Sequence, residues 1–291
     1  RAHDAGEKIV LGQKIAAGGG IEDGEKVLDI LVAHPSTAKF IATKLARRFV
    51  ADNPPPALVE RVAAAFTKSK GDIRGTLRAV FASPEFNSTE ARRAKIKTPF
   101  ELAASAIRTL GAETDARPAL HQWVARMGEP LYMYQAPTGY PDTAEHWVNT
   151  GALLERLNFA LALVSNRIPG TRVDLARFAG SAATSSTAVD QHKVVDQFLQ
   201  LVLQGDISPK SREVLMKQLS DQTTAPIAST EMSAMDNQRR EAAPQNASDD
   251  NAATGRRGQR RNRTREDATV GNPEVARIAA LIIGSPEFQR Q

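Results

Sequence analysis

Apolar residues recur at helical spacing along most of this chain, in segments that begin or end at proline or glycine. After the NPPP tract, Leu58, Val62 and Phe66 follow at intervals of four residues and therefore share one face of a helix. Further along, a proline follows Thr98, and Glu101 lies three residues after Thr98. Thr98 and Glu101 together have the spacing of a capping box at the start of a helix. Aromatic residues make up only 5% of the chain, which also favours packed helices over a sheet sandwich. We therefore expect an all-α fold, an irregular multi-helix bundle.

The segment from Pro35 to Val50 predicts a helix whose apolar side carries Phe40, Ile41, Leu45 and Phe49. The longest apolar-periodic helix should begin at Asp142 or Thr143. Before it, the stretch EPLYMYQAPTGYP is rich in proline, glycine and tyrosine, so we expect an ordered loop there. Such a loop is interpreted either as a cover over an exposed helix face or as a functional surface.

The tetrapeptide SPEF occurs twice, at Ser83–Phe86 and at Ser285–Phe288. Each copy follows an apolar helical pattern and combines a capping serine, a proline at the first position of a turn and a glutamate. We interpret both copies as signals that end a helix, because a true repeat array would recur several times at a fixed period.

Composition divides the chain into four parts. Residues 1–180 are expected to form a helical core domain, and 181–222 a linker with two further helices. The polar segment 223–270 has few large apolar residues, so we predict a disordered insertion there. The closing helix in 271–291 should then dock on the core.

Net charge alone does not indicate a nucleic-acid partner. The formal net charge is +5, but Arg256–Arg265 contains six arginines, which exceeds the whole surplus. This stretch has no aromatic residues to stack on bases, so we interpret it as a solvated linker, with an RNA, anionic polymer or lipid contact as the alternative. Nucleic acid is therefore not an expected partner.

Other compositional features narrow the class of protein. Cysteine is absent, which excludes disulfides and thiolate chemistry. No run approaches the ~20 apolar residues needed to cross a bilayer, so no membrane span is expected. The chain begins with arginine and carries no signal peptide, so we interpret it as a fragment or a processed product.

Five blocks in order, including HDAGEKIVLG, GDIRGTLRAVFASPEF and KTPFELAASAIRTLG, resemble the C-terminal half of the domain-of-unknown-function 1800 (DUF-1800) family. The resemblance covers Arg1 to about Phe178 and then the closing ALIIGSPEFQRQ. It implies a larger bacterial protein, largely helical and commonly exported, and hence a periplasmic or secreted location. It also implies a neighbouring gene for an exported protein related to sulfatases. The family has no established catalytic residues to carry over, and the cofactor is unknown.

Several residues are candidates for a pocket. His3 and Asp4 form an HD pair, which metal phosphohydrolases use with further histidines, and His34 is the next histidine along the chain. These residues supply fewer ligands than such a metal site needs, so we predict no metal. A histidine before proline, as at His34, is typical of a helix cap or loop contact. Lys44, together with Lys8, Arg47 and Lys97, could line an anionic pocket, or these cations could belong to a solvated face.

The remaining candidates lie around the long helix. Tyr140 and Trp147 could form an aromatic cleft wall for a sugar or peptide, together with Tyr132, Tyr134 and His146, or could pack in the core. Arg156 lies within an apolar helix and needs a partner, such as Glu155, Asp142 or the tyrosine-rich loop.

Two functions from different classes remain open. The first is a non-catalytic, exported binding or scaffold protein, whose partner is the sulfatase-like neighbour or an envelope polymer. The second is the helical half of a hydrolase whose site is completed by a missing N-terminal portion. Convergence of the candidate residues around one pocket would favour the enzyme. No serine-nucleophile elbow, phosphate-binding loop or zinc-protease motif is present.

Overall fold

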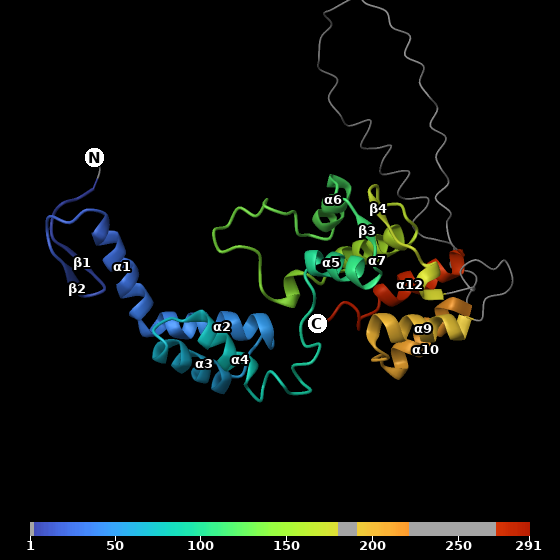
Figure 1. Ribbon diagram of the computed structural model, residues 1–291, viewed down its shortest axis with the longest axis horizontal. Helices are drawn as coiled ribbons and strands as arrows, with labels where there is room; N and C mark the ends of the chain where they lie inside the picture. Colours follow the sequence, from blue (N-terminus) through green and yellow to red (C-terminus); the bar gives the residue numbers. More distant parts are fainter. Residues whose placement is uncertain (1–2, 180–190, 221–271) are drawn as a thin grey trace, which may run out of the picture. The chain divides into compact units, whose positions relative to one another are not determined.

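The structure is a computed structural model that describes residues 3–179, 191–220 and 272–291 (Figure 1). Helices dominate these residues, which confirms the predicted all-α class, and the strands are limited to two very short pairs. The disordered insertion predicted at 223–270 lies outside the described residues. Among the helices that are described, none has the length and apolar character to cross a membrane.

The chain divides into two compact units. The first consists of Arg1–Lys97, Gln135–Trp147 and Arg290–Gln291, and the second of Thr98–Tyr134 and Val148–Gln289. Residues of the core domain expected at 1–180 thus belong to both units. The four-part division drawn from composition stays a prediction.

The first unit combines a small hairpin with a group of helices. Its elements are β1 (Lys8–Val10), β2 (Gln13–Ile15), α1 (Ile21–Ala33), α2 (Pro35–Phe49), α3 (Pro56–Lys68), α4 (Ile73–Phe81) and the 3-10 turn η1 (Ala144–His146). The hairpin was not predicted. Strands β1 and β2 are antiparallel and joined by Leu11 and Gly12, which both have positive φ, of 49° and 77°. Positive φ at both positions is what a tight two-residue hairpin turn requires, and leucine gives little signal for it.

Helices α2, α3 and α4 pack together around a small core (Figure 1). Leu58, Val62 and Val80 are fully buried and Phe66 is 5% exposed, as the four-residue spacing in α3 predicted. Asp72 caps α4, because its carboxylate accepts from the backbone N–H groups of Arg74 and Gly75.

The buried side of α2 differs from the prediction. Ala38, Ala42 and Ala46 are buried, whereas Phe40 is 60% exposed and Phe49 is 40% exposed. Alanines along one stripe allow α3 to approach closely, and the larger residues then lie beside the contact rather than in it. The predicted apolar face was therefore wrong for the two phenylalanines.

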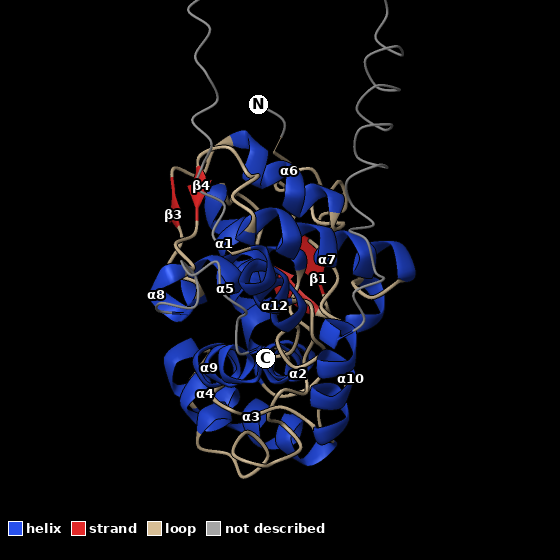
Figure 2. Ribbon diagram, turned by 90° about the vertical axis from the view of Figure 1, so that its right-hand side faces the viewer, coloured by secondary structure: helices blue, strands red, loops and turns tan. Residues whose placement is uncertain are grey.

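The second unit is the larger of the two. Its elements are α5 (Pro99–Thr109), β3 (Glu113–Thr114), α6 (Pro118–Arg126), α7 (Thr150–Val164), β4 (Thr171–Arg172), α8 (Ala176–Ala179), α9 (Gln191–Leu203), α10 (Pro209–Ser220) and α12 (Pro273–Ile283). Helix α12 packs against α7 and α9 (Figure 1, Figure 2). Phe159, Phe198 and Ile278, one from each of these helices, are fully buried. Helix α12 is thus a central part of this core.

The capping box predicted at the start of α5 is present. Thr98 Oγ1 accepts from the backbone N–H of Glu101 at 3.3 Å, and the Glu101 carboxylate accepts from the N–H of Thr98 at 2.9 Å. Two of the N–H groups that a helix start leaves without a partner are satisfied in this way.

One SPEF copy lies in each unit and closes a helix there. Ser83 Oγ accepts from the N–H of Phe86 at 3.2 Å, and Ser285 Oγ accepts from the N–H of Phe288 at 3.3 Å. The structure confirms that the motif is a helix-ending turn.

The glutamates of the two motifs tie the turns to other helices. Glu85 binds Arg61 of α3 through two hydrogen bonds of 2.7 and 3.1 Å. Glu287 accepts from the N–H of Ser208, directly before α10, at 3.3 Å. Each motif therefore fixes where its helix ends and which neighbour the turn contacts.

Candidate functional site

The histidine and aspartate of the HD pair have different partners. His3 Nε2 lies 3.2 Å from Asp23 Oδ2, and Lys8 Nζ donates to the same oxygen at 3.0 Å. Asp4 Oδ1 instead accepts from the N–H of Gly6 at 2.8 Å, which is a local turn contact. The pair therefore does not present two ligands to one point.

Asp23 is the centre of this cluster and was not predicted from the sequence. It is the third residue of α1, and only 3% of its surface is exposed. The Lys8 hydrogen bond is the largest cause of a lowered Asp23 pKa; burial opposes it, and His3 adds to the lowering. The cluster thus places a buried carboxylate between the amino group of Lys8 and the imidazole ring of His3.

Gly19 makes room for this carboxylate. A Cβ atom at that position would lie 2.0 Å from Asp23 Oδ1, which no side chain could tolerate without a shift. The triple glycine before an acidic first turn was the available sequence signal for this site. This signal could not indicate which residues bind Asp23, because Lys8 and His3 lie 15 and 20 positions away along the chain.

His34 lies at the junction of α1 and α2. Its Nδ1 accepts from the N–H of Ser36 at 3.2 Å, so it caps α2. This confirms the cap interpretation of the His-Pro pair, and none of the contacts of His34 is with His3 or Asp4.

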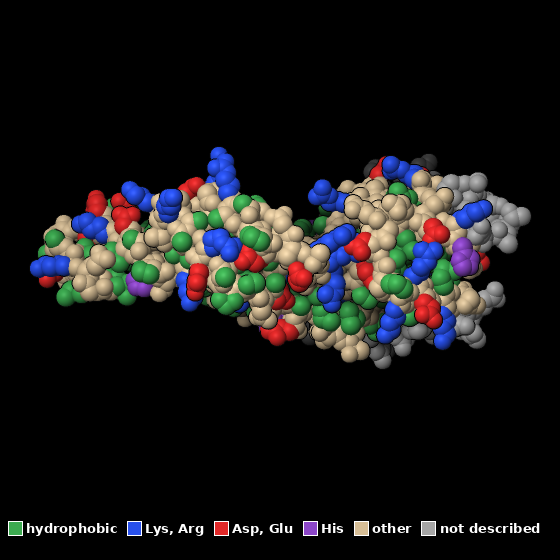
Figure 3. Space-filling view, turned by 90° about the horizontal axis from the view of Figure 1, so that it is seen from below, with side chains coloured by type: hydrophobic (Ala, Val, Ile, Leu, Met, Phe, Trp, Pro, Cys, Tyr) green, Lys and Arg blue, Asp and Glu red, His purple; other side chains and the backbone are tan. Residues whose placement is uncertain are grey.

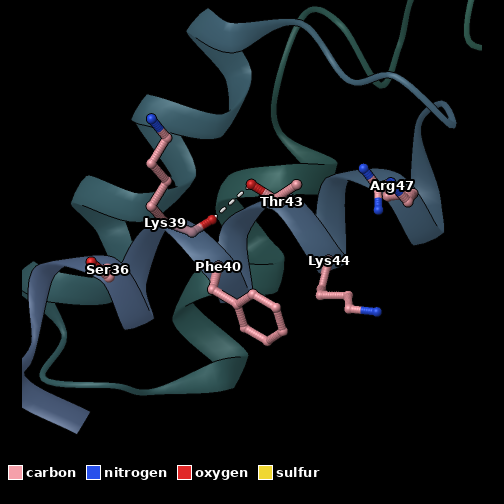
Figure 4. Close-up of a pocket in the computed structure, with 6 residues that line it drawn as sticks. All are labelled: Ser36, Lys39, Phe40, Thr43, Lys44 and Arg47. Carbon is pink, nitrogen blue, oxygen red and sulfur yellow. Dashed lines mark hydrogen bonds between the residues drawn. The ribbon is translucent and has the colours of Figure 1, made fainter. Parts of the chain in front are cut away.

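Lys44 lies on the outer side of α2, beside a depression of about 250 Å³ (Figure 4). Its ammonium donates to Asp142 at 2.5 Å and lies 5.9 Å from the centre of the Phe40 ring. Figure 4 shows Phe40 and Lys44 on one side of the helix and Lys39 pointing away. All the lining residues belong to this single helix, so the depression is a shallow surface feature.

Tyr140 and Trp147 lie together, with ring centres 5.8 Å apart. Trp147 is only 4% exposed, and its Nε1 donates to the carbonyl of Pro141 at 3.2 Å. The tryptophan therefore packs inside the first unit, and its indole N–H is satisfied by the same loop.

Asp52 and Lys95 fix the segment 135–147 in the first unit. The two side chains form an ion pair, and Lys95 is 7% exposed. The second Asp52 oxygen accepts from the N–H of Ala144 at 2.7 Å, and Lys95 also donates to the Asp142 carbonyl at 3.3 Å. Through this segment Lys44, Tyr140 and Trp147 are placed in one region.

Arg156 belongs to α7 in the second unit and is 1% exposed. Its Nη1 donates to Gln289 Oε1 at 3.3 Å. Burial lowers the pKa of Arg156 to about 10, and the charge of Glu129 acts in the opposite direction. Glu129 begins the tyrosine-rich loop, which was one of the predicted partners, whereas Gln289 was not predicted.

The candidate residues thus fall into several local arrangements. Within the part of the chain that the structure describes, no group of three His, Asp or Glu side chains is placed to hold a metal ion. The hydrogen-bond partners of His3, His34 and Lys44 are Asp23, Ser36 and Asp142, none of which is itself a candidate. Among the candidate residues, the contact between the His3 imidazole and the Asp23 carboxylate is the one that resembles a catalytic arrangement.

These features define a two-unit helical protein in which polar contacts mainly cap helices and fix loops. The chain belongs to a family described as "Protein of unknown function (DUF1800)", whose model matches residues 1–290. The match is longer than the resemblance drawn from the sequence blocks, which ended near Phe178 and resumed at the C-terminal end. Neither the comparison with curated proteins nor that with solved structures gives a significant match.

Proposed function

We propose that this chain is a non-catalytic binding or scaffold protein, periplasmic or secreted, that acts by holding a partner. The partner is an exported protein, such as the sulfatase-like neighbour that the family resemblance implies, or a polymer of the cell envelope. The observation that supports this most is the local role of the candidate residues: a turn for Asp4, a cap for His34, an ion pair for Lys44, ring packing for Tyr140 and Trp147, and a buried hydrogen bond for Arg156.

A surface suited to a protein partner lies on the hairpin and α1. Ile9 is 74% exposed and Ile21 is 80% exposed, and Leu28 and Val32 are 62% and 50% exposed. Ile21, Leu28 and Val32 are seven and four residues apart, so they form one stripe along α1. Figure 3 shows hydrophobic side chains at the surface of this N-terminal region, at the left of the view.

Contiguous exposed apolar residues are typical of interaction sites, because leaving them in water costs free energy. We refer to Ile21, Leu28 and Val32 as the α1 stripe. Its burial by a partner would account for an amphipathic helix whose apolar residues face solvent in the isolated chain.

The experiment is a comparative pull-down with the full-length protein. We expect the wild type to capture a partner that the double variant Ile21→Ser/Leu28→Ser loses. The matched control is Val214→Ser, which replaces a 47% exposed apolar residue on α10 in the other unit. Retention of the same partner by the double variant would contradict the assignment of the stripe.

The hydrolase alternative has one supporting observation, the contact between His3 and buried Asp23. A carboxylate that orients an imidazole is how a general base is positioned. Hydrolytic turnover by the full-length protein that disappears in His3→Ala, but not in His34→Ala, would establish this alternative in place of the binding function.

A further inference from the structure

Helix α1 lies outside the hydrophobic core of the first unit. That core is formed by residues of α2, α3, α4 and the loops beside them, and it includes no residue of the hairpin or of α1. Figure 1 shows α1 between the hairpin and α2. The one buried residue of α1 is Asp23, whereas Leu28 and Leu31 are 62% and 42% exposed. An amphipathic helix whose apolar residues stay outside the core is typical of a partner-binding element.

Four residues of the exposed face have the spacing of a hole in a coiled coil, at positions i, i+3, i+4 and i+7. They are Ile21, Gly24, Glu25 and Leu28, and we refer to them as the α1 hole. Ile21 and Leu28 form its two ends, and Gly24 forms its floor. A Cβ atom at Gly24 would meet no side chain of the described residues within 4 Å, so the space above the floor is open. In a coiled coil, each such hole takes one apolar side chain of the facing helix.

Glycine is an uncommon residue at a position such as Gly24. It is the least favourable residue of a helix interior after proline. The φ of Gly24 is not positive, so the backbone does not require glycine there. What glycine supplies at this position is space, because a helix face without a side chain allows a second helix to approach closely and to insert a large residue.

One edge of the α1 stripe carries free negative charge. Glu25 lies four residues after Ile21, and Asp29 lies three residues before Val32, so both carboxylates border the same side of the stripe. Both are exposed, and neither has a hydrogen bond or an ion pair with another described residue. Figure 3 shows acidic as well as hydrophobic side chains at the surface of this N-terminal region. Such an edge is complementary to lysine or arginine side chains that flank the apolar residues of a facing helix.

We infer that the α1 stripe and the α1 hole bind a basic amphipathic helix of a partner protein. One large apolar side chain of that helix fills the α1 hole, and its lysines or arginines pair with Glu25 and Asp29. This inference rests on the proposed binding function, and it selects a helical protein among the partners. A second copy of the chain is disfavoured, because an antiparallel twofold pair of α1 helices would bring the two acidic edges together. The same carboxylates disfavour an anionic membrane surface.

The probe is a synthetic three-heptad peptide with leucine at the a and d positions and lysine at e and g. Its own lysines oppose pairing with itself. A second peptide has glutamate in place of each lysine. Calorimetric titration of the full-length protein at fixed ionic strength measures both dissociation constants. We expect the lysine peptide to bind about tenfold or more tightly than the glutamate peptide, because the charges at the edge are complementary only in the first case.

Charge reversal tests the acidic edge. We expect Glu25→Lys/Asp29→Lys to prefer the glutamate peptide over the lysine peptide, because the charges are then complementary again. The matched control is Glu60→Lys/Glu213→Lys, which changes the net charge equally at exposed positions of α3 and α10. The control should keep the preference of the wild type. An unchanged preference in Glu25→Lys/Asp29→Lys, or a reversal in the control, would overturn the inference.

Filling the α1 hole separates a specific helix contact from apolar area in general. Gly24→Leu adds apolar surface and favours the helix, but it occupies the space that the partner side chain needs. We therefore expect the lysine peptide to bind about tenfold or more weakly. Ala57→Leu, at an exposed position of α3, is the control and should bind within about twofold of the wild type. Equal or tighter binding by Gly24→Leu would show that no side chain enters the α1 hole, and would overturn the inference.

The partner captured in the pull-down supplies an independent readout. Its loss in Ile21→Ser/Leu28→Ser, together with unchanged affinity in Glu25→Lys/Asp29→Lys and in Gly24→Leu, would reject the basic helix and leave the binding function in place. Binding to anionic vesicles without peptide binding would assign the stripe to a membrane and overturn the inference. A dimer that Ile21→Ser/Leu28→Ser makes monomeric, again without peptide binding, would assign the stripe to a second copy with the same consequence.

Discussion

The guanidinium of Arg156 donates to the side chain of Gln289 at 3.3 Å and so joins α7 to the turn that follows α12. Both residues are buried, and Gln289 Nε2 also donates to the carbonyl of Gly284 at 3.0 Å. The second SPEF turn is thus held by a residue directly beyond it. The contact shows how a buried charge in an apolar helix is accommodated.

Replacing Gln289 should therefore destabilise the second unit. We expect Gln289→Leu to lower the free energy of unfolding by about 1.5–3 kcal/mol, because a hydrogen-bonding partner of a buried charge is lost. Chemical denaturation followed by circular dichroism measures this change. The control is Gln218→Leu, at an exposed position of α10. It should change the free energy of unfolding by less than about 0.5 kcal/mol. Equal effects would contradict the role given to Gln289.

The cluster around Asp23 predicts a dependence of stability on pH. The pKa of Asp23 is lowered below its ordinary 3.8, chiefly by the Lys8 hydrogen bond, so folding favours the ionised carboxylate. This contribution is present above pH 3.8 and is lost as the pH falls through the lower folded pKa.

The corresponding variant is Asp23→Asn, measured by urea denaturation between pH 6 and pH 2. We expect the wild type to exceed the variant in stability at pH 6 and the difference to shrink as the carboxylate is protonated. Asp29→Asn, on the exposed side of the same helix, should show a smaller difference at pH 6. A constant difference across the range would show that the charge of Asp23 is not involved.

Removal of the ion pair between Asp52 and Lys95 should lower the stability of the fold and also make the segment 135–147 easier to cleave. Asp52→Ala leaves the buried ammonium of Lys95 and the N–H of Ala144 without this partner, and should cost about 3 kcal/mol in unfolding free energy. Asp196→Ala, which removes an exposed pair with Arg212, should cost less than about 1 kcal/mol.

Limited proteolysis supplies the local readout for the same variant. Because Asp52 holds the segment 135–147, cleavage within that segment should become faster in Asp52→Ala than in Asp196→Ala. An unchanged cleavage rate, with stability lowered, would mean that Asp52 does not fix this segment.

Local signals in the sequence were sufficient for some helix boundaries, but the predicted start of the long helix at Asp142 or Thr143 was wrong, because α7 begins at Thr150 and is capped by Asn149. Thr98 with Glu101 caps α5 as predicted, because capping depends on residues two to four positions apart. The side of α2 that is buried was not predicted well. Whether large residues or alanines face a neighbour depends on how closely that neighbour approaches, and this distance is a tertiary property.

The candidate site was less predictable than the fold. Residue type drew attention to His3, but its partner Asp23 lies 20 positions away and became visible only through the structure. The same holds for Asp52 and Lys95, which form their ion pair across 43 positions of the chain. Spacing along the chain could not indicate either arrangement.

The central proposal is that this protein binds a partner through the α1 stripe. Its most direct test is the dissociation constant of the captured partner, measured for the full-length wild type, Ile21→Ser/Leu28→Ser and Val214→Ser. The account predicts about a tenfold or greater weakening for the double variant alone, because apolar burial at the interface is lost. Equal dissociation constants for all three proteins would contradict it.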